Sequence, residues 1–186
     1  FPRLRPEQRE ARVQAWALEM LHCLGVQLEV HGQAPRNGPV LLVANHISWL
    51  DILVMHAARH CRFVSKADVK RWPVVGTLAT GAGTLYIERS SRRDALRVVH
   101  DMAQALRDGD VLAVFPEGTT SNGQAMLPFH ANLLQAAISA PAPVLPVALQ
   151  YVDPATGAPS RAASYVGDES LVGSVWRTLS SGGVRA

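Results

Sequence analysis

The residues best suited to chemistry are a histidine and an aspartate five positions apart, His46 and Asp51, within the segment N-H-I-S-W-L-D at residues 45–51. The apolar run before them predicts a buried strand, and the apolar spacing after them predicts an amphipathic helix. Helical residues five apart point about 140° away from each other, so His46 must precede the helix if its ring is to meet Asp51. Neutral imidazole accepts a proton near pH 7, and a carboxylate on its other nitrogen fixes its tautomer. The pattern therefore predicts a general base with an orienting carboxylate.

A purely structural role explains part of the same segment. Ser48 and Asp51 form an S-x-x-D capping box, which would place both at a helix N-terminus without catalysis. A carboxylate has two oxygens, so one could cap the helix while the other holds His46. Both interpretations stay open, and Ser48 is interpreted as a cap rather than as a nucleophile.

Three further segments occur in a fixed order with the first. They are G-T-L-Y-I-E-R at residues 83–89, F-P-E-G-T-T-S-N-G at residues 115–123 and V-L-P-V-A at residues 144–148. The four blocks together resemble the glycerolipid and lysophospholipid acyltransferase family, of the 1-acylglycerol-3-phosphate O-acyltransferase type, over roughly residues 26–150. The resemblance implies transfer of a fatty acyl group from an acyl thioester to the free hydroxyl of a lysophospholipid. Conversion of 1-acylglycerol-3-phosphate to phosphatidic acid is the leading expectation.

The resemblance also implies roles for individual residues. His46 would deprotonate the acceptor hydroxyl, and Asp51 would orient its ring. The blocks at residues 83–89 and 115–123 would bind the acceptor headgroup, through Arg89, Glu117 and Gly118, with Thr119 and Ser121 as neighbours. The family implies no cofactor; acyl-CoA or acyl carrier protein would bring the acyl group as a co-substrate. No metal is expected, because a zinc site needs three or four ligands in register and the sequence supplies none.

One position departs from the family pattern. The common F-P-E-G-T-R-S block has arginine where this chain has Thr120. Arginine binds phosphate in a bidentate way and threonine does not. A lyso-ornithine lipid or another lysolipid is therefore an alternative acceptor, and a non-catalytic, membrane lipid-binding member of the family is a further alternative. A lipase-like hydrolase is disfavoured because the chain lacks G-x-S-x-G.

Composition indicates a single domain that works near lipid. The chain has 186 residues with 48% apolar content, and its mean hydropathy is +0.07. Its two cysteines, Cys23 and Cys61, fit neither a disulfide framework nor a metal site, which favours a reducing compartment. No run of eighteen uncharged apolar residues predicts a transmembrane helix. We expect an enzyme that is peripheral or anchored at the cytoplasmic face of a bacterial inner membrane.

Positive charge is concentrated in one stretch. Residues 59–97 hold nine Lys and Arg against three Asp and Glu, a net +6, while the other residues sum to −3. Such a patch attracts phosphate headgroups, coenzyme A, an acidic acyl carrier protein or anionic lipid. Nucleic acid is disfavoured as a partner because no aromatic interleaving or recognised binding module accompanies the patch.

The expected fold is α/β, with an amphipathic N-terminal helix in residues 1–25 and an acyltransferase domain in residues 26–186. Apolar runs alternating with helical patterns predict a mostly parallel sheet covered by helices on both faces. Strands are expected at residues 26–31, 40–44, 62–65, 84–87, 111–114 and 144–149. Helices are expected at residues 6–24, 50–58, a short stretch ending at 75, and residues 92–107, 130–139 and 168–179.

Two of these helices leave a question for the structure. The stripe of the first, which includes Val13, Ala17 and Leu21, could lie on anionic lipid or pack on the core. The last helix is expected to pack its apolar face, which includes Val172 and Trp176, against the domain. Residues after 180 are expected to form a frayed tail.

Overall fold

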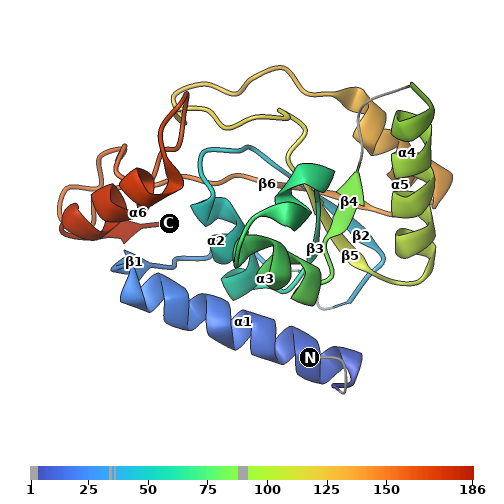
Figure 1. Ribbon diagram of the computed structural model, residues 1–186, viewed down its shortest axis with the longest axis horizontal. Helices are drawn as coiled ribbons and strands as arrows, with labels where there is room; N and C mark the ends of the chain where they lie inside the picture. Colours follow the sequence, from blue (N-terminus) through green and yellow to red (C-terminus); the bar gives the residue numbers. More distant parts are fainter. Residues whose placement is uncertain (1–3, 34, 36, 88–91) are drawn as a thin grey trace.

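A five-stranded parallel sheet, in the order β4-β3-β5-β2-β6, forms the centre of the molecule (Figure 1). The computed structural model describes residues 4–33, 35, 37–87 and 92–186. The strands are β2 (Val40–Ala44), β3 (Arg62–Lys66), β4 (Leu85–Ile87), β5 (Val111–Val114) and β6 (Val144–Val147). Every residue of β2 and β5 is buried, as expected for central strands of a parallel sheet covered on both faces.

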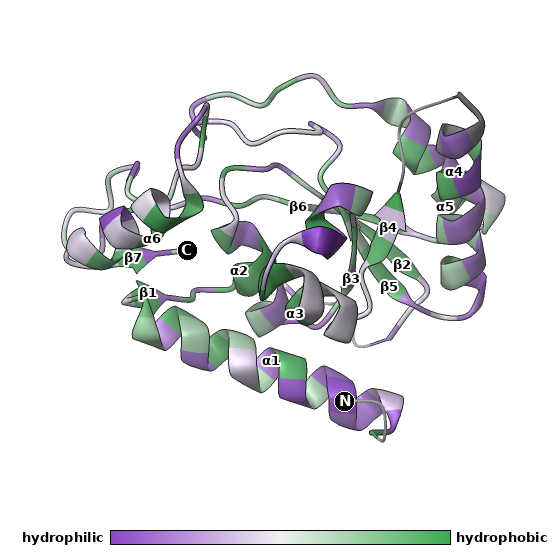
Figure 2. Cartoon of the chain, in the orientation of Figure 1, coloured by the Kyte–Doolittle hydropathy of each residue, from purple (hydrophilic) through white to green (hydrophobic). Residues whose placement is uncertain are grey.

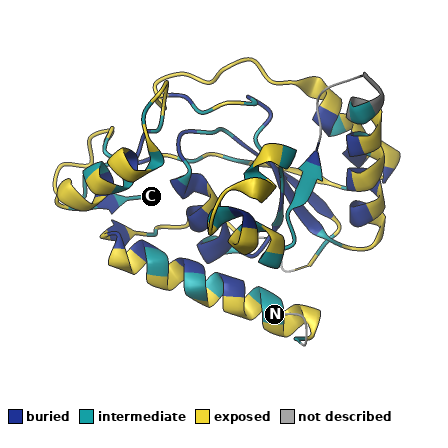
Figure 3. Ribbon diagram, viewed as in Figure 1, coloured by how far each residue is buried: buried dark blue, intermediate teal, exposed yellow. Residues whose placement is uncertain are grey.

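Helices cover both faces of this sheet, as predicted. The α-helices are α1 (Pro6–Cys23), α2 (Leu50–Ala58), α3 (Val75–Gly81), α4 (Arg92–Arg107), α5 (Gln135–Ser139) and α6 (Leu171–Ser180), and the short 3₁₀ helices are η1 (Ala67–Arg71) and η2 (Ala131–Leu134). Because strand side chains alternate, Leu41 and Val43 pack against α4 and α5, whereas Leu42 contacts the opposite layer that contains α2. Figure 3 shows the buried strands between these layers.

Helix α1 packs along α2. Its residues Val13, Ala17 and Leu21 are buried, and the last two join Leu50 and Val54 of α2 in one hydrophobic cluster. The core-packing interpretation of the first helix is therefore correct for this stripe. Of the residues the structure describes, no helix is both long and apolar enough to cross a bilayer.

The two ends of the domain meet in a second, small sheet. Strand β1 (Val26–Gln27) pairs in parallel with β7 (Val184–Arg185), and Val184 is fully buried beside Val26. The predicted strand at residues 26–31 is too long, and the prediction of a frayed tail after residue 180 is wrong. The pairing joins segments more than 150 residues apart, and no local pattern in so short a strand indicates it.

The predicted packing of the last helix is correct only in part, because Val175 packs against a core cluster but other residues of the apolar face do not. Val172 and Trp176 of α6 are 79% and 71% exposed, whereas Ser174 and Thr178 are buried. Ser174 Oγ accepts a hydrogen bond from the indole nitrogen of Trp49 at 3.1 Å, and the Thr178 hydroxyl lies 3.2 Å from the carbonyl of Ala162. Small hydroxyl side chains satisfied by hydrogen bonds therefore form most of the packed face, together with Val175.

Two further predicted helices differ from the structure. The short helix expected to end at residue 75 is replaced by η1, which ends at Arg71, and by α3, which begins at Val75. The helix expected at residues 130–139 is divided into η2 and α5. Cover of the sheet is thin at β6, where Val144 and Leu145 are 48% and 36% exposed, because β6 is an edge strand with a neighbour on one side.

Candidate active site

The candidate site lies at the carboxyl edge of the sheet. His46 follows β2 and Glu117 follows β5, and these two strands are adjacent and parallel. Their carboxyl ends therefore bring two segments 71 residues apart into contact. This edge is where open parallel sheets commonly bind ligands.

The predicted pairing of His46 with Asp51 is present. Asp51 lies in the first turn of α2, and its Oδ2 is 2.7 Å from Nδ1 of His46, which lies in the turn before the helix. The side chain of Asp51 is fully buried, whereas that of His46 is 19% exposed. Because a carboxylate only accepts hydrogen bonds, Nδ1 carries the proton of a neutral ring and Nε2 keeps its lone pair.

Asp51 serves the turn as well as the ring. Its Oδ2 also accepts hydrogen bonds from the backbone N–H groups of Ile47 at 2.7 Å and Ser48 at 3.0 Å. The hydroxyl of Ser48 accepts from the N–H of Leu50 at 3.2 Å. The orienting contact is present, but only half of the predicted capping box is formed, because the N-cap of α2 is Trp49 and the N–H of Asp51 donates to the Ser48 carbonyl at 3.2 Å rather than to its hydroxyl. The expected division of labour between the two carboxylate oxygens is wrong. One oxygen performs both tasks.

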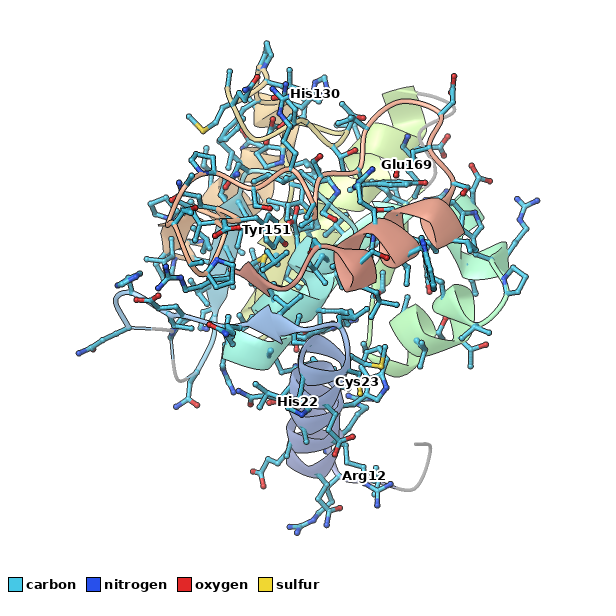
Figure 4. All side chains as sticks on the ribbon, turned by 90° about the vertical axis from the view of Figure 1, so that its left-hand side faces the viewer. Arg12, His22, Cys23, His130, Tyr151 and Glu169 are labelled. Atoms are coloured by element: carbon cyan, nitrogen blue, oxygen red, sulfur yellow. The ribbon has the colours of Figure 1, made fainter. Side chains whose placement is uncertain are left out.

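The second oxygen of Asp51 contacts a residue that the sequence analysis missed. The hydroxyl of Tyr151 donates to Oδ1 at 2.6 Å. Burial, followed by the charge of Asp51 and this hydrogen bond, raises the pKa of Tyr151 well above its ordinary value, so the phenol remains a donor. Figure 4 shows Tyr151 in the middle of the molecule. Its position just past the fourth sequence block, at the same sheet edge, is the signal that could have found it.

An aromatic ring fixes the plane of the imidazole. Phe115 stacks on His46 with ring centroids 3.9 Å apart and planes 10° apart, and Phe63 stacks on Phe115 at 5.6 Å. Phe115 opens the F-P-E-G-T block, yet the sequence analysis gave it no role. Together with Asp51, this contact leaves the ring little freedom to rotate.

Glu117 holds the turn that carries His46. Only 4% of Glu117 is exposed, and its two carboxylate oxygens accept from the backbone N–H groups of His46 at 2.6 Å and Leu127 at 2.8 Å. The N–H of Ser121 donates to the carbonyl of His46 at 2.8 Å. The F-P-E-G-T block is thus clamped to the His46 turn through backbone groups.

The remaining residues of that block shape its turn. Gly118 has φ +72°, a conformation that favours glycine, and donates to the carbonyl of Phe115 at 3.1 Å. Ser121 is buried and its hydroxyl accepts from the N–H of Gly123 at 3.3 Å, whereas Thr119 is exposed. Thr120 donates its hydroxyl to the carbonyl of Tyr165. The departure from the family pattern therefore holds a neighbouring loop in place.

The structure thus brings Glu117, Gly118 and Ser121 to the His46 turn, with Thr119 facing solvent. Arg89 lies outside the described residues. The headgroup-binding roles implied for these five residues stay predictions. Asn45, which was not predicted as a site residue, makes paired side-chain hydrogen bonds of 3.0 and 2.7 Å with the backbone of Leu149 and so joins the ends of β2 and β6.

Other titratable side chains lie in the core. Burial, followed by the neighbouring His60, lowers the pKa of His56 to about 3, and burial likewise lowers that of His60. Burial raises the pKa of the Cys61 thiol, which disfavours a thiolate nucleophile. His46 is thus set apart from His56, because its ring is partly exposed and has a carboxylate partner.

Comparisons with known proteins agree with this geometry. The acyltransferase family model matches residues 27–150. The chain is 42% identical over 177 residues to 1-acyl-sn-glycerol-3-phosphate acyltransferase of Neisseria meningitidis, covering 94% of this chain and 68% of that protein. It is 39% identical over 171 residues to lyso-ornithine lipid O-acyltransferase of Pseudomonas aeruginosa, covering 92% of this chain and 65% of that protein.

A solved structure shares the fold. The crystal structure of the 1-acyl-sn-glycerophosphate acyltransferase PlsC from Thermotoga maritima superposes with a TM-score of 0.61 at 23% identity, over 81% of this chain and 60% of that one. The chain thus has a parallel sheet with a histidine and an aspartate at its carboxyl edge. The family model matches two thirds of its residues. The chain belongs to the acyltransferase family.

Proposed function

We propose that this chain transfers a fatty acyl group from an acyl thioester to the free hydroxyl of a lysolipid, with 1-acylglycerol-3-phosphate as the leading acceptor. The observation that carries the proposal is the His46 Nδ1 to Asp51 Oδ2 contact of 2.7 Å in a chain of this family. Relatives named for phosphate and for ornithine lipid acceptors support a lysolipid as the acceptor class.

The proposed reaction is a direct transfer. Nε2 of His46 removes the proton of the acceptor hydroxyl while the oxygen attacks the thioester carbonyl, giving a tetrahedral oxyanion. Collapse of this intermediate breaks the carbon–sulfur bond, and the imidazolium returns its proton to the departing thiolate. Asp51 holds the tautomer and stabilises the imidazolium. The thiol that leaves is that of coenzyme A or of an acyl carrier protein, and no protein nucleophile takes part.

His46→Ala tests the proposal. We expect the rate to fall by about 10²–10⁴, the usual contribution of a general base. Stability should also fall, by about 1.5–3 kcal/mol, because buried Asp51 loses a donor, so turnover is measured well below the melting temperature of the variant. Thioester turnover measured with and without a lysolipid acceptor separates transfer from hydrolysis and from a non-catalytic lipid-binding protein. Retention of more than about a tenth of wild-type turnover would rule out His46 as the base. Mass spectrometry of protein quenched during turnover should detect no acyl adduct.

A lyso-ornithine lipid is the second candidate acceptor. The observation that favours it is Thr120, whose hydroxyl bonds the Tyr165 carbonyl at the position where the family pattern has a phosphate-binding arginine. A comparison of kcat/KM for lysophosphatidic acid and for a lyso-ornithine lipid distinguishes the two. Because either acceptor is a lipid, we also propose that the enzyme works at the cytoplasmic face of a membrane.

A further inference from the structure

The segment between β3 and β4 exposes apolar side chains on a rigid turn. Trp72, Val74 and Leu78, between η1 and the middle of α3, are 47%, 70% and 40% exposed. Figure 2 shows the hydrophilic η1 followed by the hydrophobic start of α3, and Figure 3 shows that this connection is exposed. We call residues 66–78 the apolar tip.

Backbone geometry holds the apolar tip in this form. Val74 has φ +63° and ψ −58°, and the N–H of Val75 donates to the carbonyl of Pro73 at 2.6 Å, which closes a strained three-residue γ-turn around a β-branched residue. Gly76 lies against η1 so closely that a Cβ there would meet the carbonyl oxygen of Lys70 at 2.2 Å. A strained valine that still faces solvent indicates a functional constraint rather than core packing.

The charge around the apolar tip is positive. Lys66, Lys70 and Arg71 are exposed and are accompanied by one acid, Asp68, which lies 3.7 Å from Arg71 in a fully solvated pair of little energetic consequence. Exposed tryptophan and aliphatic side chains ringed by cations match the interface of a bilayer with anionic headgroups. Helix α6 differs, because Arg177, the cation within its span, pairs with Glu169.

The apolar tip also lies at the catalytic edge of the sheet. It follows the carboxyl end of β3, and the turns that carry His46 and Glu117 follow the carboxyl ends of β2 and β5 in the same parallel sheet. A membrane bound at this edge would bring lipid acceptors to the site. This argument from position rests on the proposed function, whereas exposure and charge do not depend on it.

We propose that the apolar tip docks the protein on an anionic lipid bilayer, with Trp72 and Val74 inserted at the interface and Lys66, Lys70 and Arg71 against the phosphates. The test is sedimentation of the whole chain with phosphatidylcholine vesicles, prepared with and without phosphatidylglycerol. Lys70→Gln and Arg71→Gln should each weaken binding to the anionic vesicles by about 5-fold. Trp72→Ser combined with Val74→Ser should weaken it by about 10-fold or more.

The matched control is Trp176→Ser combined with Val172→Ser on α6, which removes the same side chains from an exposed stripe without the cations. It should bind vesicles as the wild type does. Every variant should keep wild-type turnover of a short-chain acceptor dissolved as monomers, so binding is judged independently of catalysis. Tip variants that bind anionic vesicles as tightly as the wild type, equal binding of the wild type to neutral vesicles, loss of binding in the α6 control instead, or a tip-dependent dimer without vesicle binding would each overturn the proposal.

Discussion

At the scale of single residues, the site is a chain of hydrogen bonds from a phenol to an imidazole. Tyr151 donates to one oxygen of Asp51 and His46 to the other, at 2.6 and 2.7 Å. Asp51 is fully buried, so these donors and two backbone N–H groups take the place of water around its carboxylate. The strength of the hydrogen bond between Asp51 and the imidazole therefore depends on how many other donors contact the Asp51 carboxylate.

Tyr151→Phe removes one of these donors without changing the ring. The carboxylate that orients the His46 ring loses one of the contacts that fix it, so kcat should fall while the acceptor KM stays nearly unchanged. Stability should fall by about 1.5–3 kcal/mol, as for a lost hydrogen bond to a charged group. Tyr165→Phe, a tyrosine that contacts the loops through its backbone, is the control. An unchanged kcat together with a lower melting temperature would assign Tyr151 a structural role alone.

Arg89→Ala tests the headgroup role that the sequence motif implies. With a phosphate-bearing acceptor, loss of a charge-assisted contact of about 1.5–3 kcal/mol should raise the acceptor KM by about 10- to 150-fold and leave the donor KM unchanged. Steady-state kinetics with both substrates varied measure this, with the exposed Arg107→Ala on α4 as the control. Unchanged phosphate-acceptor kinetics, with a lyso-ornithine lipid as the better substrate, would exclude the phosphatidic acid assignment.

At the scale of elements, two adjacent parallel strands and the turns after them build the site. The turn after β5 holds the turn after β2 through Glu117, which accepts from the N–H groups of His46 and Leu127. The Glu117 carboxylate therefore connects its own turn with the segments that contain His46 and Leu127. The F-P-E-G-T block thus stabilises the structure whether or not it also binds a headgroup.

Glu117→Gln separates these two roles. An amide keeps one acceptor oxygen and turns an NH₂ group toward the other backbone N–H, so one buried donor loses its partner at a cost of about 1–3 kcal/mol. We expect a lower free energy of unfolding in urea and a lower kcat. The exposed Glu19→Gln on α1 should change neither. If stability is kept and the acceptor KM alone rises, Glu117 acts as a headgroup ligand and not as a clamp.

At the scale of the whole molecule, a buried histidine couples folding to pH. The pKa of His56 is about 3 in the folded chain against 6.5 for an ordinary histidine, because burial disfavours the imidazolium. As the pH falls below 6.5, this histidine therefore becomes protonated in the unfolded chain before it does in the folded chain. The contribution of neutral His56 to stability is fully present above pH 6.5 and is lost as the pH falls toward 3, by about 1.4 kcal/mol per pH unit.

His56→Leu should remove this dependence. The wild type should lose about 2 kcal/mol more stability than the variant between pH 6.5 and 5, and the lowered pKa of His60 should leave a smaller slope in both. Urea unfolding followed by tryptophan fluorescence at the two pH values measures the difference. His31→Leu, at a histidine whose side chain is 85% exposed, is the control and should behave as the wild type. Equal losses in His56→Leu and the wild type would contradict the assignment.

Much of the architecture follows from local sequence patterns. The apolar runs at β2 and β5, alternating with amphipathic segments, predicted a parallel sheet with helices on both faces, because burial of regular elements leaves a period that can be read along the chain. The contact of His46 with Asp51 was predictable for the same reason, since a strand-to-helix turn brings residues five apart together.

Tertiary structure alone decided the contacts between distant segments. Tyr151 reaches Asp51 across 100 residues and Glu117 reaches the His46 backbone across 71, and the pairing of β1 with β7 joins opposite ends of the domain. None of these contacts leaves a periodic signal, because each depends on which strands are neighbours. The exposed face of α6 was mispredicted for a related reason. The helical period of α6 was predicted correctly. Which of its faces is buried depends on the segment that packs against it, and the indole of Trp49 donates a hydrogen bond to Ser174 on the buried face.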